Sequence, residues 1–511
     1  MAILLGIDIG TTNWKAVAFD ENGEILALKK TPTKTKYDDQ KRGYYDPIEL
    51  WNETATLIRE VVKELDGAKI DALSVTSMTE AIVPIDENGE PCFNIMAWFD
   101  TRAREQAEKA VEIIGKEKLF SITGLEPNPI FPIFKIMWIK DHYPEVYDKS
   151  VKFLQMADYI YWCLCRKFAT DFTIASRTLA MDLNKNAWSE GIFDKLDLRN
   201  DLFPEIFKSG TVLGNVTEEA CEKTGLSSDT PIVVGGHDHP CATLASGIKP
   251  GMKVMDSSGT AESFLFVSKV DSKVPDKFDG LRIARHLDPR YYVSWGGIIS
   301  SGVSVLWAMD NILSAKKIAE EKGVSYNDVV SELVKEVENV PVGANGVMYI
   351  PHLRGSGAPT WNPADKGTFL GLNATTTSNE MIRAVFEGLS FQARMILELQ
   401  EKTAGVIAES ICTVGGGTNF TLWQQIKSDI TGKVIEIPAV EEGTAHGAAL
   451  LAGVGIGVYK DMHEASMKVA KIKKRYYPNP EIKEKYDELY EIFKDACVAV
   501  SGINNRLDNI S

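Results

Sequence analysis

The 511-residue chain lacks several features that mark particular classes of protein. Its cysteines are an odd number and include no Cys-x-x-Cys pair, which favours free thiols in a reducing cytoplasm over a disulfide framework. No apolar run reaches the roughly 20 residues needed to cross a bilayer. No basic segment precedes the apolar start at Met1, so the sequence predicts neither a membrane span nor a signal peptide. We therefore expect a cytoplasmic protein. The cysteines are Cys92, Cys163, Cys165, Cys221, Cys241, Cys412 and Cys497.

Positive charge is also scarce. The chain has 56 Lys and Arg against 71 Asp and Glu, a net charge of −15. Nucleic acids and anionic membranes attract clustered Lys and Arg, so neither is an expected partner. A small anionic ligand is not excluded, because it needs only a local cradle. The content of 44% hydrophobic and 25% charged residues is typical of a soluble globular protein. Single cores stop growing at roughly 250 to 300 residues, so we expect two large domains; a homodimer is left open.

Two stretches of the chain share one pattern. Residues 2–28 predict three short antiparallel strands, and residues 231–267 place strand-like runs around a polar turn. Asp8-Ile-Gly-Thr-Thr and Asp256-Ser-Ser-Gly-Thr each put an aspartate before Gly-Thr at a chain reversal. We interpret this as an internal duplication, with domains of residues 1–248 and 249–511. Chance similarity between short polar turns is the alternative.

The two turns carry groups that bind phosphate. Backbone N–H groups in a tight glycine turn and threonine hydroxyls can surround phosphate oxygens, and Lys15 adds a positive charge. An aspartate at the end of a buried strand is costly unless something binds it, so Asp8 is a candidate ligand of hydrated Mg²⁺. A polar hairpin tip with a capping aspartate is the structural alternative. The turn residues are Gly10, Thr11 and Thr12 in the first copy and Gly259 and Thr260 in the second.

A third glycine-rich turn, Gly415 to Asn419, precedes a predicted helix. Glycines let another group approach the backbone closely, and a helix N-terminus favours anions and polar atoms. We take Gly416, Gly417 and Asn419 as candidate ligand-binding residues. A purely structural strand-to-helix turn is the alternative.

The segment Gly235-Gly-His-Asp-His239 is a candidate reaction centre, because an acid and two imidazoles follow a glycine pair at a strand end. Asp238 could take a proton from a hydroxyl while phosphate is transferred to that hydroxyl. Alternatively, His237 and His239 could bind the metal of a hydrolase. Spacing places no third metal ligand, and the chain contains no His-Glu-x-x-His.

Together these segments resemble the FGGY carbohydrate kinases. The resemblance implies an α/β fold of two actin-like, ribonuclease-H-type ATPase domains with Mg-ATP in the cleft between them. Its rival is a nucleotide switch or chaperone on the same actin-like fold, which would need no acceptor base. The segments similar to family motifs are 8–20 for phosphate, 132–142 and 367–388 for the two signatures, 415–426 for adenosine and 443–453 for the segment that follows.

The resemblance also implies roles for single residues. Asp238 falls where the family has its catalytic base, Gly10 to Thr12 with Gly259 and Thr260 fall on phosphate turns, and Gly416, Gly417 and Asn419 fall near the adenosine. Thr79 departs from the pattern of both glycerol kinases and xylulose kinases. The resemblance therefore implies only a class of acceptor, a ketose such as xylulose or a related ketose or polyol. His239 either contacts the sugar or packs against Pro240. The expected substrate-binding residues are Met78, Thr79, Glu80, Trp98, Asp100 and His239.

Overall fold

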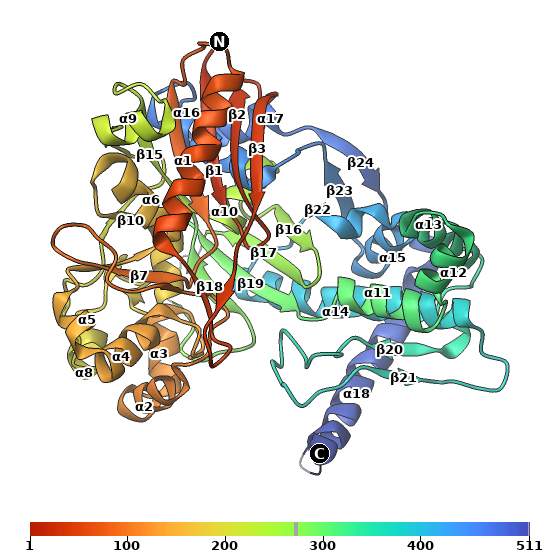
Figure 1. Ribbon diagram of the computed structural model, residues 1–511. Coiled ribbons are helices and arrows are strands. Elements are labelled where there is room, and N and C mark those ends of the chain that lie inside the picture. The colour runs from red at the N-terminus through yellow and green to blue at the C-terminus, as the bar shows by residue number, and fades with distance from the viewer. Residues whose placement is uncertain (270–273, 509, 511) are drawn as a thin grey trace.

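The computed structural model describes residues 1–269, 274–508 and 510. Two large mixed sheets form its frame (Figure 1). In the first sheet, β1 pairs antiparallel with β2 and parallel with β6, which confirms the predicted antiparallel opening. Every residue of β1 is buried, including Asp8, because this mostly apolar strand lies at the centre of a sheet covered on both faces. The strand order is β14 (Val212–Asn215), β15 (Pro231–His237), β6 (Ala72–Ser77), β1 (Ile3–Ile9), β2 (Asn13–Asp20) and β3 (Ile25–Pro32).

The second sheet repeats these connections. Its central strand β16 pairs antiparallel with the next strand, β17, and parallel with β22. This shared arrangement confirms the internal duplication. The strand order is β18 (Arg282–Arg285), β19 (Tyr292–Ile298), β17 (Glu262–Ser268), β16 (Lys253–Ser258), β22 (Ser410–Val414), β23 (Val434–Pro438) and β24 (Ile472–Tyr476).

A smaller sheet, two short strand pairs and a group of helices also belong to the first half. The small sheet contains β4 (Lys36–Tyr37), β5 (Gly43–Tyr45), β8 (Ile95–Met96), β7 (Ile82–Ile85) and β9 (Lys152–Gln155). Two further strand pairs are β10 (Ala169–Asp171) with β13 (Glu205–Phe207), and β11 (Met181–Asp182) with β12 (Ala187–Trp188). The helices are α2 (Arg104–Ile114), α3 (Lys116–Thr123), α4 (Pro132–His142), α5 (Pro144–Lys149), α6 (Met156–Cys165), α7 (Phe172–Ala175) and α8 (Glu190–Lys195).

Helices surround the two large sheets, and their ends follow the local sequence. Helix α1 (Pro47–Glu64) begins after Asp46, whose carboxylate caps two backbone N–H groups, and has proline in its first turn. Helix α15 ends at Gly432, whose left-handed conformation favours glycine. The others are α9 (Glu218–Thr224), α10 (Asp238–Ala245), α11 (Gly302–Asn311), α12 (Ala315–Lys322), α13 (Tyr326–Val337), α14 (Ser378–Ala404), α15 (Thr421–Thr431), α16 (Gly443–Gly455), α17 (Met462–Val469) and α18 (Lys483–Asp508). The remaining strands, β20 (Met348–Ile350) and β21 (Thr368–Leu370), form a hairpin.

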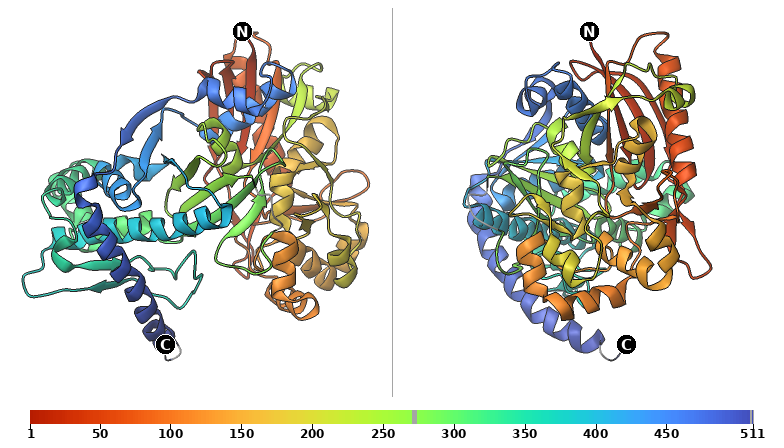
Figure 2. Two further views of the ribbon diagram at one scale, coloured as in Figure 1. Left: turned by 180° about the vertical axis from the view of Figure 1, so that it is seen from behind. Right: turned by 90° about the vertical axis from the view of Figure 1, so that its left-hand side faces the viewer.

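The two faces of the first sheet are covered by parts of the chain that are far apart in sequence. Odd-numbered residues of β1, such as Leu5 and Ile7, pack in a core with α1. Leu4 points to the other face and packs with residues of α16. Helix α16 contacts β1, β6, β15 and α10, and Figures 1 and 2 show it with α17 beside the first sheet. A segment from near the end of the chain therefore completes the core of the first half.

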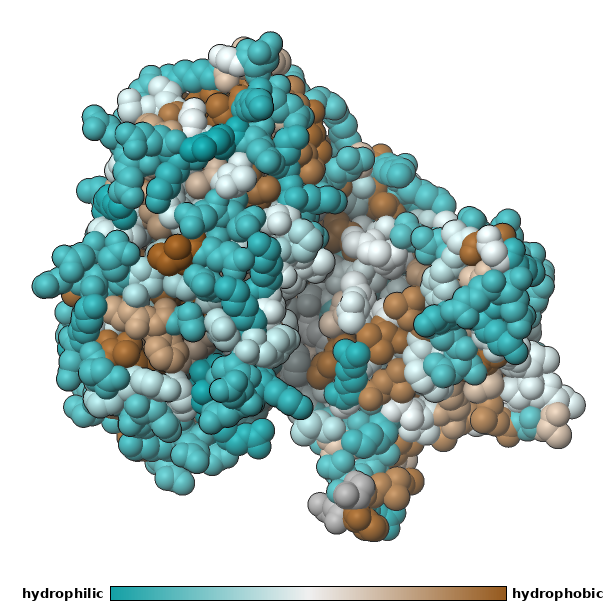
Figure 3. Space-filling view, in the orientation of Figure 1, coloured by the Kyte–Doolittle hydropathy of each residue, from teal (hydrophilic) through white to brown (hydrophobic). Residues whose placement is uncertain are grey.

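The halves face each other across a cleft, which the space-filling view shows as a hollow between two lobes (Figure 3). All seven cysteines are free. No described helix meets the length and hydropathy needed to span a membrane. On the terminal helix α18, Ile492 is 56% exposed. Tyr486, Tyr490 and Phe493 instead form the buried stripe of α18.

Candidate active site

Asp238 lies where β15 ends and α10 begins. One carboxylate oxygen, Oδ1, lies 2.6 Å from the backbone N of His239, 2.8 Å from its ring Nδ1 and 2.9 Å from Nε2 of His237. No described residue donates to the other oxygen, Oδ2. Burial alone raises the pKa of Asp238, but the adjacent imidazoles outweigh burial and hold the pKa below its usual range. The carboxylate is therefore ionised at neutral pH, with one oxygen available to accept a proton.

The two histidines hold this carboxylate in place. Burial lowers the pKa of His237, so its imidazole is neutral and an N–H can donate to Asp238. Trp295, on β19 of the second sheet, stacks on the His237 ring at 5.2 Å and contacts the His239 ring at 4.9 Å. One ligand atom from each of His237, Asp238 and His239 could meet around a metal ion. In this structure the same imidazole nitrogens are hydrogen-bonded to Asp238 instead.

Asp8, at the end of β1, faces the start of α16. Thr444 donates a hydrogen bond of 2.6 Å to Oδ2, and Lys15 Nζ lies 4.0 Å from the same oxygen. Oδ1 is buried and has no hydrogen-bond partner in the described chain. Burial raises the pKa of Asp8 to about 7. A buried carboxylate oxygen without a donor fits the predicted hydrated Mg²⁺, because that ion prefers oxygen ligands and retains its waters.

A cavity of about 370 Å³ lies between the two halves and is lined by Asp238 and by Lys15 and Thr444, the two residues beside Asp8. The first half contributes Lys15, Asp238 and His239 to its lining, and the second contributes Gly415 and residues 442–444. Helix α16 begins here without a side-chain cap, so its first N–H groups can bind an anion. The role of Thr444 was not predicted, because no local pattern indicates that its hydroxyl reaches Asp8.

A second cavity, of about 910 Å³, lies in the second half. Five predicted nucleotide-binding residues line it together: Gly259, Thr260, Gly416, Gly417 and Asn419. Its walls also include aromatic and aliphatic side chains, which suit a purine ring. They are Leu306, Tyr326, Val330, Val334, Phe420 and Trp423. The structure thus brings the second turn and the glycine-rich turn to one site.

The two duplicated turns differ in their charges. Asp256 stands at the end of β16 as Asp8 does in β1, but the buried Lys427 lies 2.5 Å from it and also contacts Glu262. Asp256 therefore shares a buried cation with Glu262, whereas the lysine beside Asp8 lies 4.0 Å away. The first turn leaves Thr11 and Thr12 exposed between Asp8 and Lys15. Phosphate binding by Gly10, Thr11 and Thr12 stays a prediction.

On the acceptor side, Glu80 is buried and paired with Arg177 at 2.6 Å. Thr79 donates a 2.6 Å hydrogen bond to Glu80, and the backbone N–H of Glu80 donates to Gln155. The buried Lys135 donates to the carbonyl oxygens of Glu80 and Ala97, each at 2.7 Å. This lysine holds together the two segments that carry the predicted acceptor residues.

The other predicted acceptor residues lie in varied environments. Asp100 is paired with Arg102 through contacts of 2.7 and 2.8 Å, and it lies three residues after Ala97, whose carbonyl oxygen accepts from Lys135. Trp98 is 37% exposed, whereas Met78 is buried and contacts the hydroxyl of Tyr45. The side chain of His239 lies beside Trp295 and lines the cleft cavity, and whether it touches a sugar stays a prediction.

Sequence reasoning missed three residues of this region: Gln155, Arg177 and Trp295. Each contacts a predicted residue from a distant part of the chain, and none belongs to a local motif. Arg177, for example, reaches Glu80 across 97 positions. Trp295 contacts Asp238's two histidine neighbours from the opposite half.

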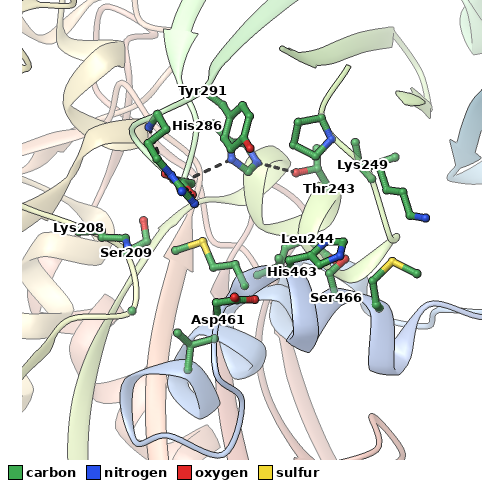
Figure 4. A pocket seen from close by; sticks show the side chains of 18 of the residues that line it. Lys208, Ser209, Thr243, Leu244, Lys249, His286, Tyr291, Asp461, His463 and Ser466 are labelled. Carbon is green, nitrogen blue, oxygen red and sulfur yellow. Dashed lines mark hydrogen bonds and ion pairs between the residues drawn. The ribbon is translucent and has the colours of Figure 1, made fainter. Parts of the chain in front are cut away.

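A separate cavity of about 290 Å³ lies at the far end of α10 (Figure 4). His286 sits in its wall, with Nε2 3.2 Å from the hydroxyl of Thr243 on that helix. Leu244, Lys249 and Asp461 also line this cavity. It contains none of the predicted site residues.

Two family models cover most of the chain. The model described as "FGGY family of carbohydrate kinases, N-terminal domain" matches residues 3–245, and its C-terminal counterpart matches residues 255–456. The chain belongs to the FGGY family of carbohydrate kinases. It is therefore a phosphotransferase with an alcohol group as acceptor, and the actin-like α/β fold expected from the sequence is confirmed. Membership of this family does not support the two alternatives, a nucleotide switch without an acceptor and a metal hydrolase.

Relatives of this FGGY kinase carry different substrate names. A xylulose kinase of Staphylococcus epidermidis is 26% identical, with 96% of each chain covered. A glycerol kinase of Saccharolobus islandicus is 27% identical, with 98% of this chain and 97% of that one covered. Among solved structures, a ligand-bound xylulose kinase from Lactobacillus acidophilus has a TM-score of 0.89 at 23% identity, covering 99% of this chain and 100% of the other. The fold is shared across these proteins, and the acceptor is not set by the resemblance.

Proposed function

We propose that this kinase transfers the γ-phosphoryl group of Mg-ATP to a hydroxyl of a small sugar, with Asp238 as the general base. One observation carries the assignment. Asp238 is ionised, keeps Oδ2 free of described hydrogen bonds and lines the cavity that joins the two halves. A base must lie within hydrogen-bond reach of the proton that it removes, and this cavity offers that position.

The nucleotide is expected to span both cavities. The adenosine would lie against the 910 Å³ cavity, near Gly416, Gly417 and Asn419. The phosphates would extend past Gly259 and Thr260 toward Lys15 and the N-terminus of α16. Mg²⁺, held by Asp8 through water, would neutralise phosphate charge there. These groups supply positioning and charge compensation, which account for most of the catalysis of phosphoryl transfer.

The proton and the phosphoryl group move in opposite directions. The acceptor hydroxyl gives its proton to Oδ2 of Asp238 as its oxygen bonds to the γ-phosphorus, and the bond from that phosphorus to the departing ADP oxygen breaks. His237 and His239 hold Oδ1, which fixes the carboxylate plane during transfer. Trp295 covers the histidines from the second half and excludes water that would otherwise hydrolyse ATP.

The relatives named xylulose kinase support a ketose as the acceptor, such as xylulose or a related ketose or polyol. The test is a coupled assay of ADP release with ketopentoses, ketohexoses, deoxyketoses, sugar acids, glycerol and tetritols. At least one of them should stimulate ADP release well above the rate with ATP alone. The absence of stimulation by every acceptor would contradict the proposed function.

A further inference from the structure

Most charged side chains around the acceptor side of Asp238 have a partner of opposite charge. Arg177 is paired with Glu80, and Arg102 with Asp100. Glu126, another acid near this region, is paired with Lys116. These pairs matter because a buried charge without compensation is costly.

Arg282, the first residue of β18, has no such partner. In the described part of the chain its guanidinium makes no ion pair and no hydrogen bond, and its buried Nε has no acceptor. Its one strong contact is with the ring of Trp361, whose centroid lies 4.3 Å away. The attraction between a cation and an aromatic ring compensates part of the hydration free energy that burial removes, but it leaves the N–H donors unused. Arg282 therefore has N–H donors that no described side chain uses.

The position of Arg282 connects it to the acceptor. Arg282 is the cross-strand partner of Trp295, so the two side chains lie on the same face of the second sheet. Trp295 in turn contacts both histidines beside Asp238, and Arg177 lies 5.2 Å from its ring centroid. Burial and the charge of Arg177 lower the pKa of Arg282 to about 10, so it remains charged at neutral pH.

We propose that the acceptor is a sugar acid whose carboxylate binds Arg282, while a hydroxyl at its other end faces Asp238. This proposal rests on the kinase function proposed above and narrows its acceptor from ketoses and polyols in general to their acidic relatives, the ketoaldonic and aldonic acids. A guanidinium binds a carboxylate through parallel N–H donors, which would satisfy the unused donors of Arg282. A carboxylate can accept two of these donors side by side, which a single neutral hydroxyl cannot do.

The first test compares acids with their neutral counterparts in the ADP-release assay on the wild-type enzyme. The pairs are aldonic acids against alditols, and ketoaldonic acids against ketoses, of equal carbon number. The best acid should show a kcat/KM at least about 10-fold above its neutral counterpart, as one charge-assisted contact provides. Sugar phosphates form a further arm of the assay.

The second test replaces Arg282. Arg282→Gln should lower kcat/KM for the best acid by about 10- to 150-fold, mainly through KM, and leave neutral acceptors within about 3-fold. Arg282→Lys should restore part of the loss, because it keeps the charge but not the paired donors. Arg290→Gln, an exposed arginine on the loop that follows the same strand, is the matched control and should change neither.

The outcomes separate the two proposals. If neutral ketoses or polyols are the best acceptors, or if sugar phosphates exceed the acids, the carboxylate proposal is overturned while the kinase function stands. An Arg282→Gln enzyme with unchanged kcat/KM for acids would also overturn it. If no acceptor stimulates ADP release, the kinase proposal itself fails. Should Arg282→Gln not fold, the wild-type comparison still decides.

Discussion

At the scale of single residues, the two carboxylate oxygens of Asp238 have different roles. Oδ1 is held by the backbone and two imidazoles, and Oδ2 is left for the reaction. The same contacts that lower its pKa also weaken it as a base, so its advantage lies in position rather than basicity.

Asp238→Asn tests this role. The amide has the same shape but cannot accept the proton, so kcat should fall by roughly 10²- to 10⁴-fold while ATP binding changes little. Coupled ADP release measures the first quantity and titration calorimetry with ATP the second. Asp201→Asn, at an exposed position, serves as the control. Full activity of Asp238→Asn would show that another group is the base.

Lys135 leads to a prediction about pH. Burial lowers the pKa of Lys135 to about 7, whereas an unfolded lysine has a pKa near 10.4. Between these values the unfolded chain binds more protons, so the free energy of unfolding should rise with pH, by up to about 1.4 kcal/mol per unit. Lys135→Met removes this contribution, while also losing two hydrogen bonds.

The measurement is thermal unfolding of both proteins at pH 7 and pH 9. The wild type should gain stability relative to Lys135→Met over this interval. Lys366→Met, an exposed lysine far from the cleft, should follow the wild-type pH dependence. Parallel pH profiles for wild type and Lys135→Met would contradict the lowered pKa.

Residues that act through a local pattern could be predicted, and residues that act through distant contacts could not. Asp238 follows a glycine pair at a strand end, and Gly416, Gly417 and Asn419 open a helix, so their residue types and order carry the signal. Arg177 and Arg282 are single arginines in unremarkable segments. Their importance depends on which charges the fold leaves unpaired.

At the scale of elements, the contact between α10 and α16 positions both the proposed base and the proposed phosphate site. Helix α10 begins with Asp238, and α16 begins beside Thr444, which binds Asp8. Gly447 lets the helices approach, because a Cβ at this position would overlap the backbone carbonyl of Cys241. The spacing of these two helices therefore sets the distance between base and phosphate site.

Gly447→Ala should force the helices apart. Overpacking of this kind costs about 1 to 3 kcal/mol, and the displaced α10 should lower kcat by 10-fold or more. Unfolding temperature and ADP release are the measurements. Gly502→Ala is the matched control, since a Cβ on this α18 glycine meets nothing and alanine favours a helix. A fully active, equally stable Gly447→Ala enzyme would contradict the role of this contact.

Strands and helices could be predicted where apolar residues recur at a regular spacing in the sequence. The strands β1, β2 and β3 lie within the predicted residues 2–28, and β15, β16 and β17 lie in or next to the predicted residues 231–267. The placement of α16 was not predictable. Its sequence indicates an apolar helix, but nothing in it says that the helix covers the first sheet rather than the second.

At the scale of the whole molecule, the predicted division into residues 1–248 and 249–511 stays a prediction, and the α16 contact crosses it. An isolated fragment 1–248 should expose the sheet face that includes Leu4, Val17 and Val233. We expect it to bind a hydrophobic dye and to lack cooperative unfolding. Fusing residues 440–470 to its end should reduce dye binding. A fragment that unfolds cooperatively without α16 would contradict this prediction.

The crossing of α16 also has a consequence for biosynthesis. The last long strand of the first sheet ends at residue 237, and α16 starts at residue 443. At roughly 5 to 20 residues per second, the ribosome adds the 205 residues between them in about 10 to 40 s. Throughout that interval the nascent chain carries an apolar sheet face that only its own later segment fits. Chaperones that hold nascent chains should therefore engage this kinase until its second half emerges.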